Sequence, residues 1–261
     1  MVIHSSLGAP ATADEILTAV DRPVALFLDV DGTLLDIADR PDQVAVPPEV
    51  VAALAEAERN LDGALALVSG REFDELDRLF RPLKLRAAAV HGAELRYEPD
   101  TAPVPAPGTS ELPSSLWNAL ADTLRQFPGT FAENKRYSFA VHYRLAPHAE
   151  APLREAVMRL VEAEPRVAVQ LMNARRAIEL KAPGYDKGRA IAAFLSVPPF
   201  RGRTPIYIGD DTTDEAGFAA VSAREGFAYA VGQPRPGTCG VFSGPREVRA
   251  WLAEFAGRRS E

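Results

Sequence analysis

Short apolar runs alternate with amphipathic segments in the first part of the chain. Val24–Val30 is a continuous apolar run that ends in acid, which is typical of a strand buried on both faces. Pro48–Asn60 has a proline at its start and apolar residues at helical spacing, so it predicts a helix. Leu65–Val68 and Ala87–Val90 predict two more buried strands. Strands that alternate with helices in this way predict a parallel sheet.

A proline-rich stretch then interrupts the pattern. Residues 99–113 carry five prolines and a glycine, a composition typical of a linker or loop rather than of a core element. Beyond it, Ser114–Phe127 predicts a helix, and Ser138–Leu145 alternates as a strand with one buried face does. The apolar side of that strand holds Phe139, Val141, Tyr143 and Leu145.

The same arrangement occurs a second time before the first pattern returns. Residues 153–161 predict another helix, and alternation in residues 167–171 and 178–180 predicts two more strands. From Lys187 onward, a helix, the short apolar strand Pro205–Ile208 and a last amphipathic helix resume the core pattern. We therefore expect an α/β fold: a Rossmann-like parallel-sheet core with an inserted α+β cap domain, in which helix-strand-strand is repeated twice. The expected boundaries are 1–108 and 184–261 for the core and 109–183 for the insert.

Composition and charge exclude several classes of function. The 261 residues carry a net charge of −7, which argues against a broad nucleic-acid or anionic-membrane surface. No apolar run approaches the roughly 20 residues of a membrane span, and no signal-peptide pattern is visible at the N-terminus. The one cysteine, Cys239, fits a reducing compartment. We expect a cytoplasmic protein without nucleic-acid or membrane partners.

Polar residues follow the predicted core strands. The first strand ends in Asp29-Val30-Asp31-Gly32-Thr33, and the second is followed by Ser69-Gly70-Arg71. The strand after the insert is followed by Gly209–Glu215, which contains Asp210, Asp211 and Asp214, and Lys187-Gly188 opens the helix before that strand. Ligands of open parallel sheets bind at the carboxyl ends of the strands. We expect these groups to form one site.

Each of these strings has a simpler interpretation when it is taken alone. Asp29–Thr33 can form only an Asx turn, and Ser69 can cap a helix. The acidic loop can be solvated surface, and Lys187 a surface lysine. Their order and their common place at strand ends favour the joint site.

These residue types suit phosphoryl transfer. Mg²⁺ prefers oxygen ligands, typically one or two carboxylates completed by water and substrate phosphate. A carboxylate can also act as a nucleophile and form an aspartyl-phosphate. Lysine, hydroxyl and backbone amide groups stabilise charge on the transferred phosphoryl group. The constellation predicts a magnesium-dependent phosphatase that acts on a phosphate monoester.

The four strings Asp29–Thr33, Ser69, Lys187 and Gly209–Asp214 resemble the motifs of the haloacid dehalogenase superfamily of phosphatases. Within it, the chain is most similar to the trehalose-6-phosphate phosphatase family over roughly Val24 to Gly232. That closer resemblance rests on four strings: His91-Gly92-Ala93-Glu94; Glu133-Asn134-Lys135 with His142-Tyr143-Arg144; Glu179 with Gly184, Lys187 and Gly188; and Gly209–Glu215.

The resemblance implies a role for each core residue. Asp29 would be the nucleophile, and Asp31 the general acid and base. Mg²⁺ would be held by the Asp29 carboxylate, the Asp31 carbonyl and Asp210, with Asp211 and Asp214 as outer supports. Ser69, Gly70 and Lys187 would hold the phosphate, with Thr33 and Arg71 in supporting positions. A separate synthase would supply trehalose 6-phosphate.

The strands of the insert carry polar residues in pairs. Glu133 and Lys135 are two residues apart, as are His142 and Arg144, and Glu179 and Lys181, so each pair shares a strand face. Such a face offers the donors and acceptors that a sugar needs. We expect Glu133, Lys135, His142, Arg144 and Glu179 to bind the sugar as the cap closes over the core. The simpler interpretation is a solvated face of a two-layer domain.

Two other functions remain compatible with these strings. The core motifs do not choose between trehalose 6-phosphate and sucrose phosphate or a mannosyl- or glucosyl-phosphoglycerate. A non-catalytic sugar-phosphate sensor would belong to a different class, but Asp29, Asp31, Lys187 and Asp210 are all present.

Overall fold

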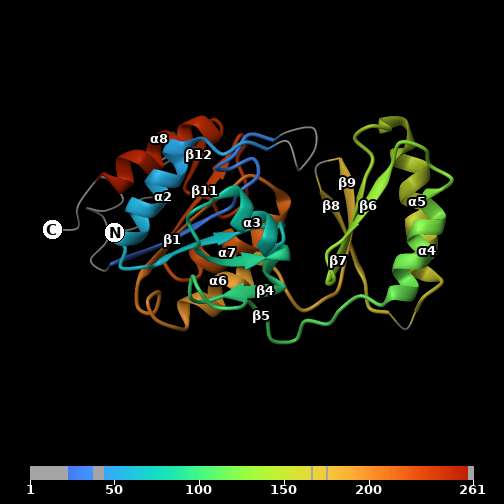
Figure 1. The fold of residues 1–261 in the computed structure, drawn as a ribbon, viewed down its shortest axis with the longest axis horizontal. Helices are drawn as coiled ribbons and strands as arrows, with labels where there is room; N and C mark the ends of the chain where they lie inside the picture. Colours follow the sequence, from blue (N-terminus) through green and yellow to red (C-terminus); the bar gives the residue numbers. More distant parts are fainter. Residues whose placement is uncertain (1–22, 38–43, 166, 175, 258–261) are drawn as a thin grey trace. The chain divides into compact units, whose positions relative to one another are not determined.

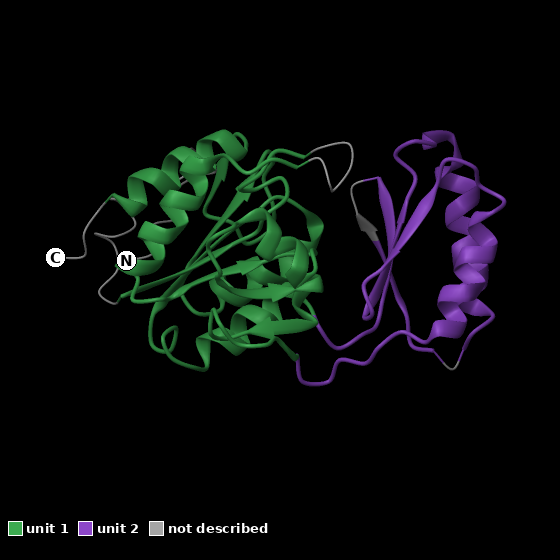
Figure 2. Ribbon diagram, viewed as in Figure 1, with its two compact units in different colours: residues 1–105, 186–261 green, residues 106–185 purple. Residues whose placement is uncertain are grey.

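The computed structural model describes residues 23–37, 44–165, 167–174 and 176–257. The N-terminal segment in which a signal peptide was sought lies outside these residues. The chain divides into two compact units, one formed by residues 1–105 and 186–261 and the other by residues 106–185 (Figure 2).

The larger unit is built on an eight-stranded sheet in the order β12-β11-β10-β1-β2-β3-β4-β5. Its strands are β1 (Val24–Leu28), β2 (Leu65–Val68), β3 (Arg86–Ala89), β4 (Glu94–Arg96), β5 (Val104–Pro105), β10 (Thr204–Gly209), β11 (Phe227–Val231) and β12 (Gly240–Phe242). The strands from β12 to β3 are parallel, while β4 and β5 are antiparallel to their neighbours. Every residue of β1 and β2 is buried, as their continuous apolar runs predicted.

Helices cover the two faces of this sheet (Figure 1). The helix α2 (Pro48–Asn60) packs against α8 (Pro245–Ala256), and α6 (Lys187–Leu195) packs against α7 (Glu215–Ser222). A fifth helix, α3 (Phe73–Leu79), connects β2 to β3. The pair α2 and α8 covers one face of the sheet, and the pair α6 and α7 covers the other (Figure 1). The predicted α/β core is confirmed.

The edge of the sheet corrects one sequence interpretation. Val104 and Pro105 lie in the proline-rich stretch that was expected to be a linker, yet they form β5 and pair with β4. Proline is tolerated there because an edge strand leaves one side of its backbone unpaired. The short strands β4, β11 and β12 were also not predicted.

The smaller unit has two layers. Its helices are α4 (Ser114–Leu124) and α5 (Glu150–Glu162), and its strands are β6 (Phe131–Asn134), β7 (Ser138–His142), β8 (Gln170–Ala174) and β9 (Ala177–Lys181). The strands form an antiparallel sheet in the order β6-β7-β9-β8. The two helices lie side by side on one face of it (Figure 1). The element order is helix-strand-strand twice, as the sequence predicted.

One predicted strand of this unit is too long. β7 ends at His142, and Arg144 and Leu145 form a turn instead of continuing the strand to Leu145. The alternation there was misleading, since Leu145 is 61% exposed while Phe139 and Val141 are buried. The amide of Ala146 donates to the carbonyl of Tyr143, so the backbone bonds of this segment close a turn rather than a ladder.

Candidate active site

Three neighbouring strands bring the predicted core residues to one edge of the sheet. β1 lies between β2 and β10 and is parallel to both. Leu28 is in register with Ile208 and Leu67, so the residues that follow the three strands emerge side by side. The backbone amide of Asp29 donates to the carbonyl of Ile208 at 3.0 Å, which fixes the start of the first loop against β10.

Asp29 is buried and held on both carboxylate oxygens. Lys187 Nζ donates to its Oδ1 at 2.7 Å, and Thr33 Oγ1 donates to its Oδ2 at 3.1 Å. Burial raises the pKa of Asp29 well above its ordinary value, Lys187 opposes the rise, and the charges of Asp214 and Asp210 add to it. The carboxylate therefore has a fixed orientation in a site where negative charge is in excess.

Asp210 lies directly against the first loop. The hydrogens of Gly32 face its carboxylate, and a Cβ at Gly32, whose φ is +85°, would collide with that carboxylate. Burial and the charge of Asp214 raise the pKa of Asp210 to about 7. Glycine is thus required at position 32 both for the turn and for the approach of Asp210 to Asp29.

Asp214 supports the other groups of the site. Its Oδ1 accepts hydrogen bonds from Lys187 Nζ at 2.6 Å and from the buried hydroxyl of Tyr207. Its Oδ2 accepts from the backbone amides of Asp210 at 3.0 Å and Asp211 at 2.9 Å. Two bonds to each oxygen use the lone pairs that a carboxylate offers. Asp214 anchors Lys187 and shapes the acidic loop.

Lys187 is buried between two carboxylates. Burial by itself would lower the pKa of its ammonium group, but the charges of Asp214 and Asp29 raise that pKa above its ordinary value. The lysine opens α6, where the side chain of Asp186 caps the helix by accepting from the amide of Arg189. A permanent positive charge thus stands beside Asp29.

Asp211 and Arg235 make further contacts in the acidic loop. Asp211 accepts from the amide of Thr212 at 2.6 Å and caps the short 3₁₀ helix η4 (Thr212–Asp214). Arg235 donates to the carbonyl of Asp210 at 3.3 Å and to Glu215 Oε1 at 3.3 Å. Asp211 acts on the loop's backbone, and Arg235 ties the loop to the segment that follows β11.

Ser69 and Gly70 follow β2 and are held from behind by the turn after β3. Ser69 is buried, its hydroxyl accepts from the amide of Arg71 at 3.2 Å, and its carbonyl accepts from the amide of His91 at 2.8 Å. A Cβ at Gly70 would collide with the imidazole of His91. Glycine at position 70 therefore makes room for His91.

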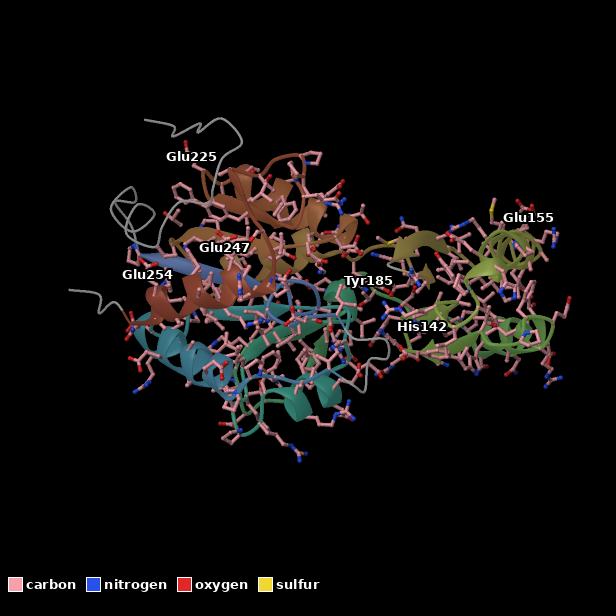
Figure 3. All side chains as sticks on the ribbon, turned by 90° about the horizontal axis from the view of Figure 1, so that it is seen from above. His142, Glu155, Tyr185, Glu225, Glu247 and Glu254 are labelled. Carbon is pink, nitrogen blue, oxygen red and sulfur yellow. The ribbon has the colours of Figure 1, made fainter. Side chains whose placement is uncertain are left out.

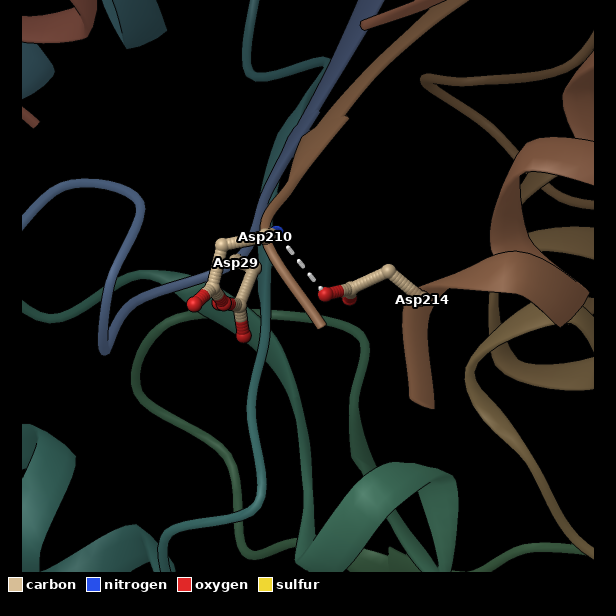
Figure 4. Close-up of side chains that lie close together, drawn as sticks. All are labelled: Asp29, Asp210 and Asp214. Atoms are coloured by element: carbon tan, nitrogen blue, oxygen red, sulfur yellow. Dashed lines mark hydrogen bonds between the residues drawn. The ribbon is translucent and has the colours of Figure 1, made fainter. Parts of the chain in front are cut away.

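The carboxylates fit a divalent cation. One oxygen each from Asp29, Asp210 and Asp214 lie within 4.8 Å of one another (Figure 4). Lys187 supplies the ammonium group that pairs with Asp29 and Asp214. With Asp210, the cluster therefore has three carboxylates near one lysine. Burial raises the pKa values of Asp29 and Asp210, and the charges of the neighbouring acids raise them further. Hard oxygen donors with uncompensated charge are what Mg²⁺ binds.

A second polar cluster lies on the sheet of the smaller unit. Glu133 is 3.3 Å from His142 Nε2 and 3.6 Å from Lys135 Nζ, measured to its Oε2. The imidazole of His142, labelled in Figure 3, stacks on Phe131 with ring centroids 4.6 Å apart. The nearby imidazole of His142 and the charge of Lys135 hold the pKa of Glu133 below its ordinary value. Three of the five predicted sugar-binding residues therefore meet.

The other two predicted sugar-binding residues are placed differently. Glu179 is buried and pairs with Ala140, which pairs in turn with Glu133, so both acids lie in one row on the same sheet face. Arg144 lies in the turn after β7 and does not continue the face of His142. Lys181, on the face of Glu179, donates to the carbonyl of Tyr185 at 2.6 Å and so fixes the exit from β9.

Sequence reasoning missed Tyr207, Arg235 and the role of His91. Tyr207 lies within the apolar run of β10, so nothing in the local pattern marked its hydroxyl as a partner of Asp214. Arg235 lies 21 residues beyond Asp214 in the sequence, in a glycine- and proline-rich loop. His91 stood in a string that was noted, but only the structure places it against Gly70.

Comparison with solved structures shows which fold the chain adopts. The C-terminal domain of Candida albicans trehalose-6-phosphate phosphatase aligns with a TM-score of 0.82 at 19% identity, covering 97% of this chain and 99% of that one. A phosphatase of the haloacid dehalogenase superfamily from Bacteroides thetaiotaomicron aligns with a TM-score of 0.53 at 19% identity, over 89% and 93% of the two chains. The fold is that of haloacid dehalogenase phosphatases.

Sequence comparison then gives the family. A family model described as trehalose-phosphatase matches residues 27–236. A probable trehalose-phosphate phosphatase of Sinorhizobium fredii is 40% identical over 257 residues, covering 96% of each chain. The Escherichia coli trehalose-6-phosphate phosphatase is 40% identical over 229 residues, 87% of this chain and 85% of the relative. The chain belongs to the trehalose-phosphatase family, whose members are phosphoric monoester hydrolases. Among its described residues, no helix is long and apolar enough to span a membrane.

Proposed function

We propose that this protein hydrolyses trehalose 6-phosphate to trehalose and phosphate, with Asp29 as the nucleophile. The observation that carries the proposal is the Asp29 carboxylate, which is buried, held by Lys187 and Thr33, and adjacent to Asp210. The relatives at 40% identity support the choice of sugar.

In the first half-reaction, an oxygen of Asp29 attacks phosphorus while the bond from phosphorus to the sugar oxygen breaks. Asp31 gives its proton to that oxygen, and trehalose leaves. In the second half-reaction, Asp31 takes a proton from water as the water oxygen attacks phosphorus, and the bond to Asp29 breaks. Lys187, the hydroxyl of Ser69 and the amide of Gly70 bind the phosphoryl oxygens.

Mg²⁺ is the cofactor that fits the carboxylates, and we assign Asp29, Asp210 and the backbone carbonyl of Asp31 as its ligands. The cation would neutralise charge on the phosphoryl group. Asp214 is assigned as a support because all four of its lone-pair positions already accept hydrogen bonds. Asp211 supports the same loop as its cap.

A substrate panel tests the proposal. Phosphate release should be fastest, in kcat/KM, on trehalose 6-phosphate when compared with sucrose phosphate, mannosyl- and glucosyl-phosphoglycerate and hexose phosphates. EDTA should abolish release, and added Mg²⁺ should restore it. Equal or faster turnover of another sugar phosphate, or full activity in EDTA, would contradict the assignment. A separate synthase as the source of substrate and a cytoplasmic location remain predictions.

We further propose that the cluster of Glu133, Lys135 and His142, with Glu179 in the same row, binds sugar hydroxyls. The side chains of the cluster pair with one another, so each is oriented before a ligand arrives. Arg144 is kept as a candidate at the adjoining turn.

Glu133→Gln tests this role. Replacing a charged acceptor of a sugar hydroxyl should raise KM for trehalose 6-phosphate about 10-fold, because hydrogen bonds to charged groups contribute about 1.5–3 kcal/mol. Turnover of p-nitrophenyl phosphate, which has no sugar, should stay unchanged. Glu155→Gln is the matched control, since Glu155 lies on α5 with its side chain 70% exposed (Figure 3). An unchanged KM in Glu133→Gln would remove this residue from the sugar site.

A further inference from the structure

Arg71 makes a two-point ion pair with Asp31, the residue to which the proposed function gives both proton transfers. Arg71 Nε lies 2.6 Å from Asp31 Oδ2, and Nη2 lies 2.7 Å from Oδ1. The arginine side chain is 6% exposed, whereas that of Asp31 is 34% exposed. Two parallel bonds from a planar guanidinium fix the plane of a carboxylate as well as its position, which lysine cannot do.

The structure also fixes Arg71 itself. Its amide donates to Ser69 Oγ at 3.2 Å, and its carbonyl accepts from the amide of Val90 at 3.0 Å. A third guanidinium nitrogen, Nη1, lies 3.3 Å from Glu75 Oε1 on α3. The arginine is thus anchored through its backbone on one side and through its charge on the other.

The turn behind Arg71 is held in a costly conformation. Val90 and His91 have φ values of 47° and 54°, in the left-handed region that residues with a side chain rarely adopt. Such residues cost on the order of 1–3 kcal/mol each and persist when their surroundings determine them. Here the two amides of the strained residues donate to Arg71 and Ser69. The two strained residues therefore lie where their amides bind the backbone carbonyls of Ser69 and Arg71.

We propose that Arg71 is a positioning residue for Asp31, holding its carboxylate in the plane from which it exchanges a proton with the leaving sugar oxygen. The side chain of Asp31 is more exposed than that of Arg71, and among the described residues Arg71 provides the hydrogen bonds to its carboxylate. Without the guanidinium, the carboxylate of Asp31 would rotate among several orientations in solvent. Each bonded oxygen of Asp31 keeps a second lone pair for the proton. This inference rests on the proposed function of the site.

Leaving-group dependence tests the proposal. The leaving oxygen of trehalose needs a proton, whereas p-nitrophenolate leaves without one, and kcat/KM reports the steps up to departure of the leaving group. In Arg71→Gln, kcat/KM for trehalose 6-phosphate should fall about 100-fold, at the lower end of general acid catalysis. For p-nitrophenyl phosphate it should fall less than about 3-fold on the same reasoning. Arg71→Lys should recover only part of the loss, because it restores charge without the fork.

A double-mutant cycle separates positioning from other roles. In an Asp31→Asn background, Arg71→Gln should add little further loss on trehalose 6-phosphate, because the residue it positions is already disabled. Arg78→Gln, on an α3 residue whose side chain is 55% exposed, is the matched control and should behave as wild type. If thermal unfolding shows that Arg71→Gln does not fold, Arg71→Lys replaces it in both the comparison of the two substrates and the double-mutant cycle.

The outcomes separate the two proposals. Equal losses on both substrates, or an Arg71 effect that adds fully to that of Asp31→Asn, would overturn the positioning role while leaving the proposed function intact. Failure of the wild-type protein to hydrolyse trehalose 6-phosphate would overturn the proposed function instead.

Discussion

Asp29→Asn is expected to lower turnover of trehalose 6-phosphate by at least about 10⁴-fold, since removing a nucleophile of a covalent mechanism removes the reaction path itself. The amide is nearly isosteric with the carboxylate, and its oxygen can still accept from Lys187 or Thr33, so the site should keep its shape. Binding of the sugar phosphate, measured by calorimetry with Mg²⁺ present, should survive.

The covalent intermediate gives a second readout of the same variant. Wild-type protein quenched in acid during turnover of labelled substrate should retain an acyl phosphate, and Asp29→Asn should retain none. Asp36→Asn is the control, because Asp36 is in a nearby segment, 73% exposed, and pairs with Arg249 at 3.0 Å. Turnover of trehalose 6-phosphate by Asp29→Asn within about 10-fold of wild type would exclude Asp29 as the nucleophile.

Lys187→Met is expected to impair both folding and catalysis. The ammonium group is 3% exposed and pairs with Asp29 and Asp214 at 2.7 and 2.6 Å, so its loss leaves two buried carboxylates facing each other. Removing one partner of a buried ion pair costs about 3–5 kcal/mol of unfolding free energy. Denaturant unfolding in EDTA measures that loss at pH 8, and Lys84→Met, at an exposed lysine, is the control.

The destabilisation by Lys187→Met should depend on pH with a defined sign. Burial already raises the pKa of Asp29, and loss of the ammonium group removes the largest influence that lowers it. The folded variant then binds protons more readily than the unfolded chain, so its stability relative to wild type should recover as the pH falls toward about 5. A loss that is the same at both pH values would contradict this account of Lys187.

The local sequence pattern predicted much of the fold because buried parallel strands are short continuous apolar runs. β1, β2 and α2 were found at or within a residue or two of the expected bounds. β5 could not be found in this way, since its residues are exposed and one is a proline. The strand that ends at His142 was predicted to run to Leu145, because alternation in sequence does not show whether the backbone stays in a sheet or turns.

The sequence predicted which residues meet at this edge of the sheet, but not which of their side chains pair with one another. Asp29, Asp31, Ser69, Lys187 and Asp210 follow strands or open a helix, so the topology of a parallel sheet suffices to bring them to one edge. The pairing of Arg71 with Asp31 joins residues 40 apart, and that of Lys187 with Asp29 joins residues 158 apart. No local pattern encodes the angle and distance at which such side chains meet.

By itself, the sequence determined the family, and the order of carboxylates, hydroxyl and lysine after successive apolar runs predicted a phosphoryl-transfer site. Only the tertiary structure decided how these groups contact one another. In it, Asp214 accepts four hydrogen bonds, Asp211 caps the helix η4, and Arg71 pairs with Asp31. The physical reason is that residue type and strand order are local properties, whereas hydrogen-bond occupancy and burial exist only after distant segments have packed together.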